Sequence, residues 1–189
     1  MNDFLPTSID YSNRLQSLLF NMQWQSLETL GVKLLECWKN KQHVFICGNG
    51  GSAANAIHIA NDLVYGAGGL KAEALSANTA VLTCLANDLS YEDIYAQQIK
   101  IKASAGDLLI ILSGSGNSKN IILALNLARK IGSKTIGFMG NDGGGMKDCV
   151  DVGIIVPSND TARIQEVHIT IGHIICEIIE QDLIHENKI

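Results

Sequence analysis

A glycine-rich junction between a predicted strand and a predicted helix constrains this chain more than any other feature. The run at residues 44–47 is short, apolar and partly β-branched, as buried parallel strands are. Gly48-Asn49-Gly50-Gly51 follows it, and Ser52 stands where a helix would begin. The free N–H groups and positive dipole end of such a helix bind phosphate. The junction therefore predicts an anion site.

A second junction of the same kind follows the apolar run at residues 110–112. Its sequence, Ser113-Gly114-Ser115-Gly116-Asn117-Ser118, is rich in hydroxyl groups and so offers O–H as well as N–H donors. Two such junctions in one chain indicate a small phosphorylated ligand.

Predicted strands and helices alternate along the chain. Strand-like runs occupy residues 43–47, 72–75, 108–112, 135–139 and 152–156, and helical runs occupy 80–85, 91–101, 118–130 and 161–183, with another starting at Ser52. Residues 9–38 are also helical in pattern, either as one helix or as two with a break near 23–26. The alternation predicts βαβ units and a parallel sheet covered on both faces.

Charge and composition exclude several classes of protein. The net charge is −5 with no cluster of Lys or Arg, so no direct nucleic-acid partner is expected. No apolar run is long enough to span a membrane, and the N-terminus is acidic rather than signal-like. The five cysteines lack Cys-x-x-Cys pairs and lie among apolar neighbours, which predicts buried, reduced thiols. We expect a cytoplasmic protein of one domain.

Side chains suited to chemistry occur on two predicted helices. His58 and Asp62 are four residues apart, so they project from one face and could share a metal ion, act as an acid–base pair, or make a plain surface contact. Gln165 and His173 are about 12 Å apart along the last helix, so they either meet one ion, if the glutamine reaches back, or are core side chains bonded to the backbone or to neighbours. His168 lacks a motif and is predicted to be structural. The many isoleucines of this helix predict contact with another subunit.

Two predicted turns carry polar side chains. Asn87 and Asp88 precede Ser90-x-x-Asp93, which is typical of a capping box for the next helix. The two residues either bond sugar hydroxyls or simply form the turn. Asn141-Asp142-Gly143-Gly144-Gly145 is predicted to be a plain turn after a strand.

A dinucleotide site is a second interpretation of the first junction. Gly48-x-Gly50-x-x-Ala53 fits the glycine fingerprint, and Glu73 stands near the distance of a ribose-binding acid. The serine-rich second loop would then be redundant, and Glu73 falls within its strand rather than at the end of it. The sequence disfavours a dinucleotide site.

Taken in order, these motifs resemble those of the sugar isomerase (SIS) domain family, and within it the phosphoheptose isomerase branch. They are Gly48-Asn49-Gly50-Gly51-Ser52, His58, Asn87-Asp88, Ser113-Gly114-Ser115-Gly116-Asn117-Ser118 and Arg163-Ile164-Gln165-Glu166-Val167-His168. Each piece is short, but their combination in this order is specific to the family. The resemblance runs from the first helix to Leu183.

The resemblance implies an α/β fold, a three-layer αβα sandwich around a parallel, flavodoxin-like five-stranded sheet. Residues 41–189 would form the SIS domain, and residues 1–40 an N-terminal helical segment that packs in the oligomer. The implied assembly is a homotetramer with active sites at subunit interfaces, and the implied partner is a small-molecule sugar phosphate.

The resemblance also implies a set of site residues. The substrate would be bound by Asn49, Gly50, Gly51, Ser52, Asp62, Asn87, Asp88, Ser113, Gly114, Ser115, Ser118 and Gln165. One zinc ion per subunit would be held by His58, Asp62, Gln165 and His173. Asp62 and His173 would be the catalytic residues.

The implied activity is aldose–ketose isomerisation of sedoheptulose 7-phosphate to D-glycero-D-manno-heptose 7-phosphate, a heptose precursor for lipopolysaccharide, capsule or related glycans. Two positions depart from the branch: Asp62 replaces a usual Glu, and Gly114 replaces a common Thr. They leave open a different sugar phosphate. The resemblance is also compatible with a sugar-phosphate sensor and with a non-catalytic SIS protein that binds the replication initiator. His173 argues against the non-catalytic protein.

Overall fold

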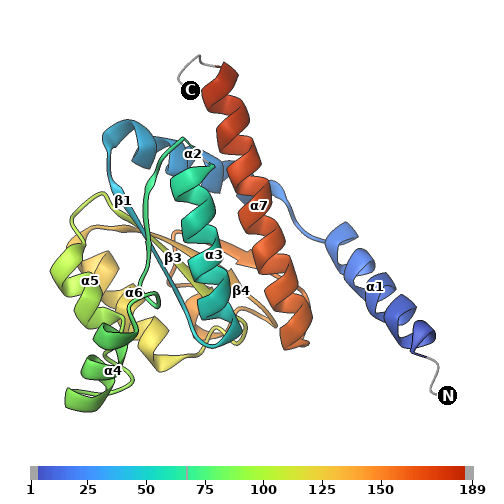
Figure 1. The fold of residues 1–189 in the computed structure, drawn as a ribbon, viewed down its shortest axis with the longest axis horizontal. Helices are drawn as coiled ribbons and strands as arrows, with labels where there is room; N and C mark the ends of the chain where they lie inside the picture. The colour runs from blue at the N-terminus through green and yellow to red at the C-terminus, as the bar shows by residue number, and fades with distance from the viewer. Residues whose placement is uncertain (1–3, 67, 186–189) are drawn as a thin grey trace.

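A five-stranded sheet lies at the centre of the molecule, in a computed structural model that describes residues 4–66 and 68–185 (Figure 1). Its strands are β1 (His43–Gly48), β2 (Lys71–Ala74), β3 (Leu108–Ser113), β4 (Lys134–Met139) and β5 (Val152–Ile155). Their order is β2-β1-β3-β4-β5, and every neighbouring pair is parallel. This is the flavodoxin-like order, so the predicted fold class is confirmed.

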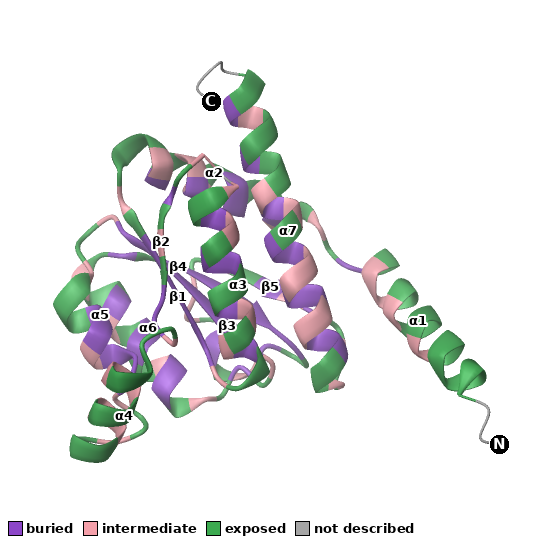
Figure 2. Ribbon diagram, viewed as in Figure 1, coloured by how far each residue is buried: buried purple, intermediate pink, exposed green. Residues whose placement is uncertain are grey.

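Helices cover both faces of the sheet, because each strand sends alternate apolar side chains to opposite sides. On β3, Ile110 and Leu112 face α2 (Gln25–Asn40), α3 (Gly51–Tyr65) and α7 (Thr161–His185), whereas Leu109 and Ile111 face α5 (Ala96–Lys102) and α6 (Lys119–Ile131). Figure 2 shows the buried residues gathered along the strands and the inner helix faces. Two cores therefore hold three layers together.

The N-terminal helical pattern forms two helices, α1 (Leu5–Phe20) and α2, separated at residues 21–24. Helix α1 projects from the body and has no buried residue (Figure 1). The Tyr11 hydroxyl donates to the Glu166 carboxylate, and the Arg163 guanidinium lies 4.1 Å from the centre of the Tyr11 ring. An isolated helix of this length is marginally stable in water, so α1 depends on such contacts.

Helix α7 buries one apolar stripe against its own chain. The stripe consists of Ile164, Val167, Ile171, Ile175, Ile179 and Leu183, and it packs against α2 and α3. Ile178 and Ile184 are left 38% and 53% exposed. Most of the isoleucines that predicted a second subunit are thus covered within the chain.

The segment around Asn87 differs from the prediction. Asn87 and Asp88 end α4 (Thr79–Asp88) rather than forming a turn after it. The Ser90 hydroxyl donates to Asp93 Oδ2 over 2.7 Å and accepts from the Glu92 N–H over 3.1 Å. These local bonds favour a turn, and α5 begins only at residue 96, so the predicted capping box caps no helix.

All five cysteines are free thiols, and two of them, Cys37 and Cys47, are buried. Burial raises the pKa of Cys37 to about 11. Cys84 is exposed, so its predicted burial is wrong, because it lies on the outer side of α4. None of the helices described here is long and apolar enough to cross a membrane.

His168 is a fully buried histidine under β4. Its Nε2 lies 3.3 Å from the Met139 carbonyl oxygen, and its ring packs against Phe138. Its Nδ1 has no protein partner among the described residues. Burial lowers the pKa of His168 from 6.5 to about 4. The residue is structural, as predicted.

This burial makes stability depend on pH. Below its ordinary pKa of 6.5, His168 takes up a proton in the unfolded chain but stays neutral in the folded chain until about pH 4. The contribution of neutral His168 to the free energy of unfolding is therefore complete above pH 6.5. It falls by about 3 kcal/mol as the pH drops towards 4. Urea unfolding of the wild-type chain and of His168→Gln between pH 7 and pH 4 measures it. We expect the variant to lose this pH dependence, and parallel profiles would refute the prediction.

Candidate active site and metal centre

The first predicted junction lies at the carboxyl edge of the sheet, between β1 and α3. Gly50 has φ +55°, a conformation that side chains disfavour. A Cβ at Gly48 would lie 2.7 Å from the backbone of Ser52, so the loop can turn this tightly only with glycine there. The helix begins at Gly51, one residue before the predicted start. The N–H groups of Ser52 and Ala53 donate to the carbonyls of Asn49 and Gly50, both over 3.0 Å. The positive end of the helix dipole lies at this loop, as an anion site requires.

The second junction follows β3, next to the first. The Ser113 hydroxyl accepts from the Gly116 N–H and the Ser115 hydroxyl accepts from the Asn117 N–H, both over 3.2 Å. Ser118 is the N-cap residue of α6 but makes no capping bond with its side chain. Its hydroxyl and the positive end of the helix dipole remain suited to phosphate.

A brace that the sequence did not reveal holds this serine loop. The Gly114 carbonyl accepts from the Gly140 N–H (3.1 Å) and from Asn141 Nδ2 (2.9 Å). In return the Asn117 side chain accepts from the Gly145 N–H (2.9 Å). The segment predicted to be a plain turn therefore fixes the shape of the loop. The run of three glycines was the signal, since it allows close backbone approach.

The tightest contact of this brace gives a prediction at Gly116, whose φ is +64°. A Cβ there would overlap the Gly143 carbonyl oxygen. We expect Gly116→Ala to lower the free energy of unfolding by about 2 kcal/mol or more, measured in urea, because αL strain and backbone overlap add. Gly69→Ala is the matched control: Gly69 has φ +77° with open space around its Cα, so only the strain remains. Equal losses in the two variants would contradict the prediction.

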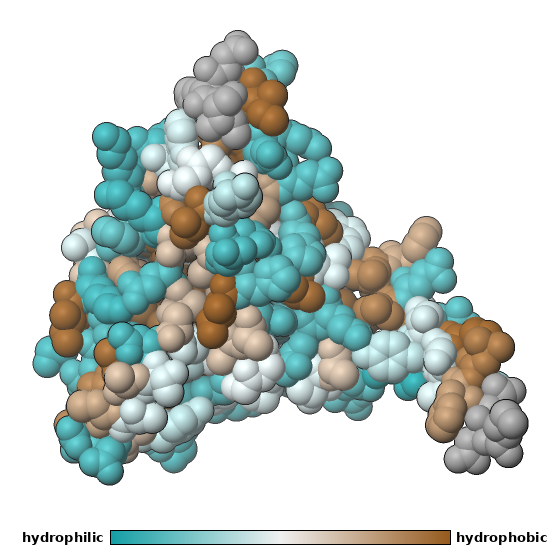
Figure 3. Space-filling model, viewed as in Figure 1, coloured by the Kyte–Doolittle hydropathy of each residue, from teal (hydrophilic) through white to brown (hydrophobic). Residues whose placement is uncertain are grey.

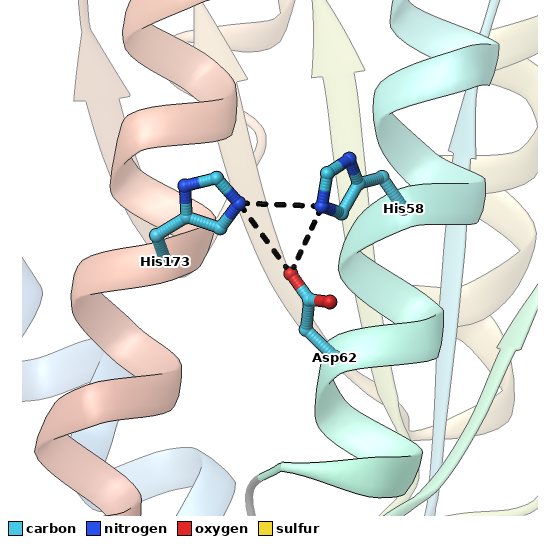
Figure 4. A group of neighbouring side chains, drawn as sticks. All are labelled: His58, Asp62 and His173. Atoms are coloured by element: carbon cyan, nitrogen blue, oxygen red, sulfur yellow. Dashed lines mark hydrogen bonds and ion pairs between the residues drawn. The ribbon is translucent and has the colours of Figure 1, made fainter.

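Three further predicted site residues converge between α3 and α7 (Figure 4). His58 Nε2 lies 3.4 Å from Asp62 Oδ2, His173 Nε2 lies 3.6 Å from the same oxygen, and the two Nε2 atoms are 3.3 Å apart. The imidazoles are half exposed and the carboxylate is 22% exposed. The group is open to solvent on one side. One chain supplies all three residues.

Gly172 lets the two helices approach closely at this point. A Cβ at Gly172 would lie 2.6 Å from Ile59 Cγ1, and these two residues are next to His173 and His58 in sequence. The approach brings the two imidazoles together.

The three ligand atoms fit a zinc ion. Zinc bonds of about 2.0–2.1 Å in a tetrahedron place neighbouring ligand atoms about 3.3 Å apart, which is close to the three separations here. All three atoms lie within 4.8 Å of one another. Two histidines and one carboxylate, with a fourth position open, form a donor set typical of catalytic zinc.

Gln165 does not join this group in the described structure. Its side-chain amide lies against Gly51, where even a methyl group would overlap it, and its backbone carbonyl accepts from Asn55 Nδ2 over 2.8 Å. His58 lies seven positions after Gly51, which is about 10 Å further along α3. Gln165 therefore lies at the glycine loop and His173 at His58, because α3 and α7 run in the same direction.

Helix α3 also separates the two ends of the predicted site. Eleven residues run from Gly51 to Asp62, about 16 Å of helix. The serine loop lies at the same sheet edge as Gly51, since Gly48 pairs with Leu112. Within one chain, Asp62 is therefore remote from the predicted phosphate site.

Asn87 and Asp88 lie on the exposed end of α4. Asn87 Nδ2 donates to Asp88 Oδ1 over 2.8 Å, and Cys84 Sγ lies 3.4 Å from Asp88 Oδ2. These two hydrogen bonds lower the pKa of Asp88. A neighbouring cavity of about 290 Å³ is lined by Asn49, Gly50, Ser76, Thr83 and Tyr91 among others, but by neither of the two residues.

A dinucleotide site finds no support in this geometry. Glu73 forms an ion pair with Lys102 instead of standing free at a strand end. The sheet order, with β2 at the edge beside β1, is the flavodoxin-like one rather than that of dinucleotide-binding domains.

Comparisons with known proteins agree on one family. Residues 9–140 match the family model of the SIS domain. A phosphoheptose isomerase from Clostridium acetobutylicum is 45% identical over 166 residues, which cover 86% of this chain and 85% of the relative. A solved phosphoheptose isomerase from Francisella tularensis has a TM-score of 0.89 at 28% identity, covering 96% of this chain and 100% of its own. Another, from Neisseria gonorrhoeae, has a TM-score of 0.87 at 33% identity, covering 94% and 97%.

Proposed function

This chain belongs to the SIS domain family, and on that premise we propose that it is an aldose–ketose isomerase acting on sedoheptulose 7-phosphate. The product would be D-glycero-D-manno-heptose 7-phosphate, for heptose synthesis in the cytoplasm. The observation that carries the proposal is the meeting of Asp62 and His173 in a chain that matches phosphoheptose isomerases over most of its length. A carboxylate beside an imidazole is the pair that a proton shift between neighbouring carbons needs.

In this mechanism Asp62 removes the proton from the carbon next to the carbonyl group. The enediolate that forms is reprotonated at the neighbouring carbon by His173, or His173 moves the hydroxyl proton; when Nε2 holds the ion, only Nδ1 of His173 can carry this proton. Both side chains must come within about 3 Å of the reacting carbons, and their mutual distance of 3.6 Å allows one substrate to meet both.

His58, Asp62 and His173 would hold the zinc ion. Gln165 is the proposed fourth ligand and would have to come from a second copy of the chain, because Gln165 of the same chain lies against Gly51. When bound, zinc would act as a Lewis acid towards the substrate's oxygens. The two oxygens of Asp62 offer a way to combine its roles. Oδ2 faces the imidazoles, while Oδ1 points elsewhere and accepts from Asn61 Nδ2 over 3.2 Å. One oxygen can then serve the ion and the other the proton.

The two loops at the sheet edge would bind the rest of the substrate. Ser113, Ser115 and Ser118, with the backbone at Gly114, would grip the phosphate. The sugar would lie along the loop from Asn49 to Ser52 and near Asn87 and Asp88. Binding energy from the phosphate, remote from the reacting carbons, helps to position them.

We further propose that a second copy of the chain completes each site, within a homotetramer. About 16 Å of helix α3 lies between Gly51 and Asp62, more than the substrate spans between its phosphate and reacting carbons. Helix α1 and its N-cap residue Phe4 offer the apolar surface for assembly: Phe4, Ile9 and Phe20 are 73%, 52% and 87% exposed. Figure 3 shows apolar residues along this projecting helix.

Complementation between two inactive variants tests the shared site. Asp62→Asn and the double variant Ser113→Ala, Ser118→Ala would each be inactive alone. Unfolded together and refolded as a mixture, they would regain activity, because some sites would receive both intact halves. A mixture that stays inactive, while wild-type protein recovers under the same treatment, would refute the shared site.

Incubation with sedoheptulose 7-phosphate in D₂O, followed by NMR, tests the function itself. We expect aldose phosphate to appear with deuterium at the carbon beside the carbonyl group. Binding without exchange would point to a sensor. Neither binding nor exchange would favour a non-catalytic regulatory protein.

A further inference from the structure

The side chain of Asn49, in the middle of the glycine loop, is held by two other elements. Asn49 Nδ2 donates to Asn120 Oδ1 over 2.9 Å, and Asn120 Nδ2 donates back to Asn49 Oδ1 over 2.8 Å. The Tyr91 hydroxyl donates to the same Asn49 oxygen over 3.0 Å. The two amides thus form a reciprocal pair, and the tyrosine closes it from the side of the cavity.

Asn120 is buried, with 2% of its surface exposed. Its Oδ1 also accepts from the N–H of Ile121 over 3.0 Å, so both lone pairs of this oxygen are used. A buried amide is costly unless it is paired, and here the pairing depends on Asn49. No role in the proposed reaction accounts for Asn120.

Most of the hydrogen-bonding capacity of the Asn49 side chain is in turn used within the protein. Its oxygen accepts two hydrogen bonds and its nitrogen donates one. This use of the amide favours a structural task for the side chain, with the backbone of the loop left to face the ligand. Tyr95 adds to the restraint, since its buried hydroxyl donates to the Gly48 carbonyl.

The amide pair lies where the two ligand loops leave the sheet. Gly48 of β1 and Leu112 of β3 form the last backbone pair between these strands. Beyond it the chains diverge into the glycine loop and the serine loop, and no ladder bond joins them. Asn120 is the second residue of α6, directly after the serine loop. The amide pair therefore ties one loop to the other.

We propose that Asn120 is a positioning residue that fixes the glycine loop relative to the serine loop. The sugar at one loop is then held at a fixed position relative to the phosphate at the other. The proposal rests on the proposed isomerase function for its kinetic consequences. A misplaced glycine loop would shift the reacting carbons, and a small displacement of a bound substrate costs a large factor in rate. The serine loop keeps its own brace from residues 140–146, so phosphate binding should survive.

The experiment compares wild-type protein with Asn120→Ala, Asn120→Asp and Tyr91→Phe. For Asn120→Ala we expect kcat to fall about 10- to 100-fold. The KM for sedoheptulose 7-phosphate and the inhibition constant of inorganic phosphate should change less than about threefold. Asn120→Asp keeps the shape but puts an oxygen against Asn49 Oδ1, so a comparable loss is expected. Tyr91→Phe removes one solvent-exposed hydrogen bond, the one to Asn49 Oδ1, and should lower kcat a few-fold. Asn126→Ala, an exposed asparagine on the same helix, is the matched control.

Amide hydrogen exchange provides a readout that needs no substrate. In Asn120→Ala the N–H groups of Gly50 and Gly51 should exchange faster, and those of Ser115 and Gly116 should not. If wild-type protein shows no turnover, the proposed function fails, and the exchange data still decide the role of Asn120.

Two results would overturn the proposal. One is wild-type kcat together with wild-type exchange at Gly50 and Gly51. The other is an equal loss of kcat and of phosphate affinity with faster exchange in both loops, which would show a general structural role. If Asn120→Ala does not fold, Asn120→Asp and Tyr91→Phe decide between these outcomes in the same way.

Discussion

Replacing Asp62 by asparagine should reduce isomerisation about 10³-fold. The amide keeps the size of the side chain but cannot take a proton, and general-base catalysis contributes roughly 10²–10⁴-fold. Deuterium incorporation into sedoheptulose 7-phosphate, followed by NMR, measures proton removal directly, and it should fall with turnover. In zinc-free protein the thermal transition should move little, because the carboxylate lies at an open group with half-exposed neighbours.

Two further variants serve as controls for this result. Asp62→Glu restores a carboxylate with the longer reach usual in the branch that the sequence resembles, and it should keep activity within about tenfold of wild type. Glu36→Gln removes an exposed carboxylate from α2 and should leave activity unchanged. If Asp62→Asn incorporated deuterium into the substrate at the wild-type rate, another group would have to remove the proton. That result would refute the proposed mechanism.

The second large effect concerns the metal. We expect wild-type protein dialysed against zinc to retain about one ion per chain, and His58→Ala to retain less than about a tenth of that. Removing one imidazole leaves Asp62 and His173 of this group, fewer than the three protein ligands of a catalytic zinc site. Elemental analysis gives the content, and added zinc should raise the melting temperature of the wild-type protein only.

His43→Ala is the matched control for this test. His43 is an exposed histidine stacked on Phe45, outside the metal group, and its loss should leave the zinc content unchanged. Equal zinc content in His58→Ala and wild-type protein would show that the three side chains hold no ion.

Local pattern was enough to predict the sheet and its helices. Buried strands such as β3 are continuous apolar runs, and the glycine and serine junctions lie directly after β1 and β3 where a parallel sheet brings them together. The pairing of His58 with Asp62 followed from helix geometry alone, and their meeting with His173 required only that α3 and α7 be neighbours.

What the sequence did not reveal depends on contacts between distant segments. The roles of Asn120 and of the turn at 141–145 arise from hydrogen bonds to other loops. The glycines of the turn signal a close backbone approach but not which loop it approaches, and nothing in the sequence around Asn120 signals its role. Gln165 could not be assigned either, because its reach depends on which part of α3 faces it. The substrate and metal roles of these residues stay predictions.

The close approach of α3 and α7 at Gly172 makes the metal group depend on the spacing of residues within the two helices. The two helices run in the same direction, so residues along one helix face successive residues along the other. Gly51 faces Gln165, and His58 faces His173. One inserted or deleted residue between these pairs would rotate the downstream histidine by about 100° and turn it away. The number of residues between these pairs, on both helices, is therefore a requirement of the metal group.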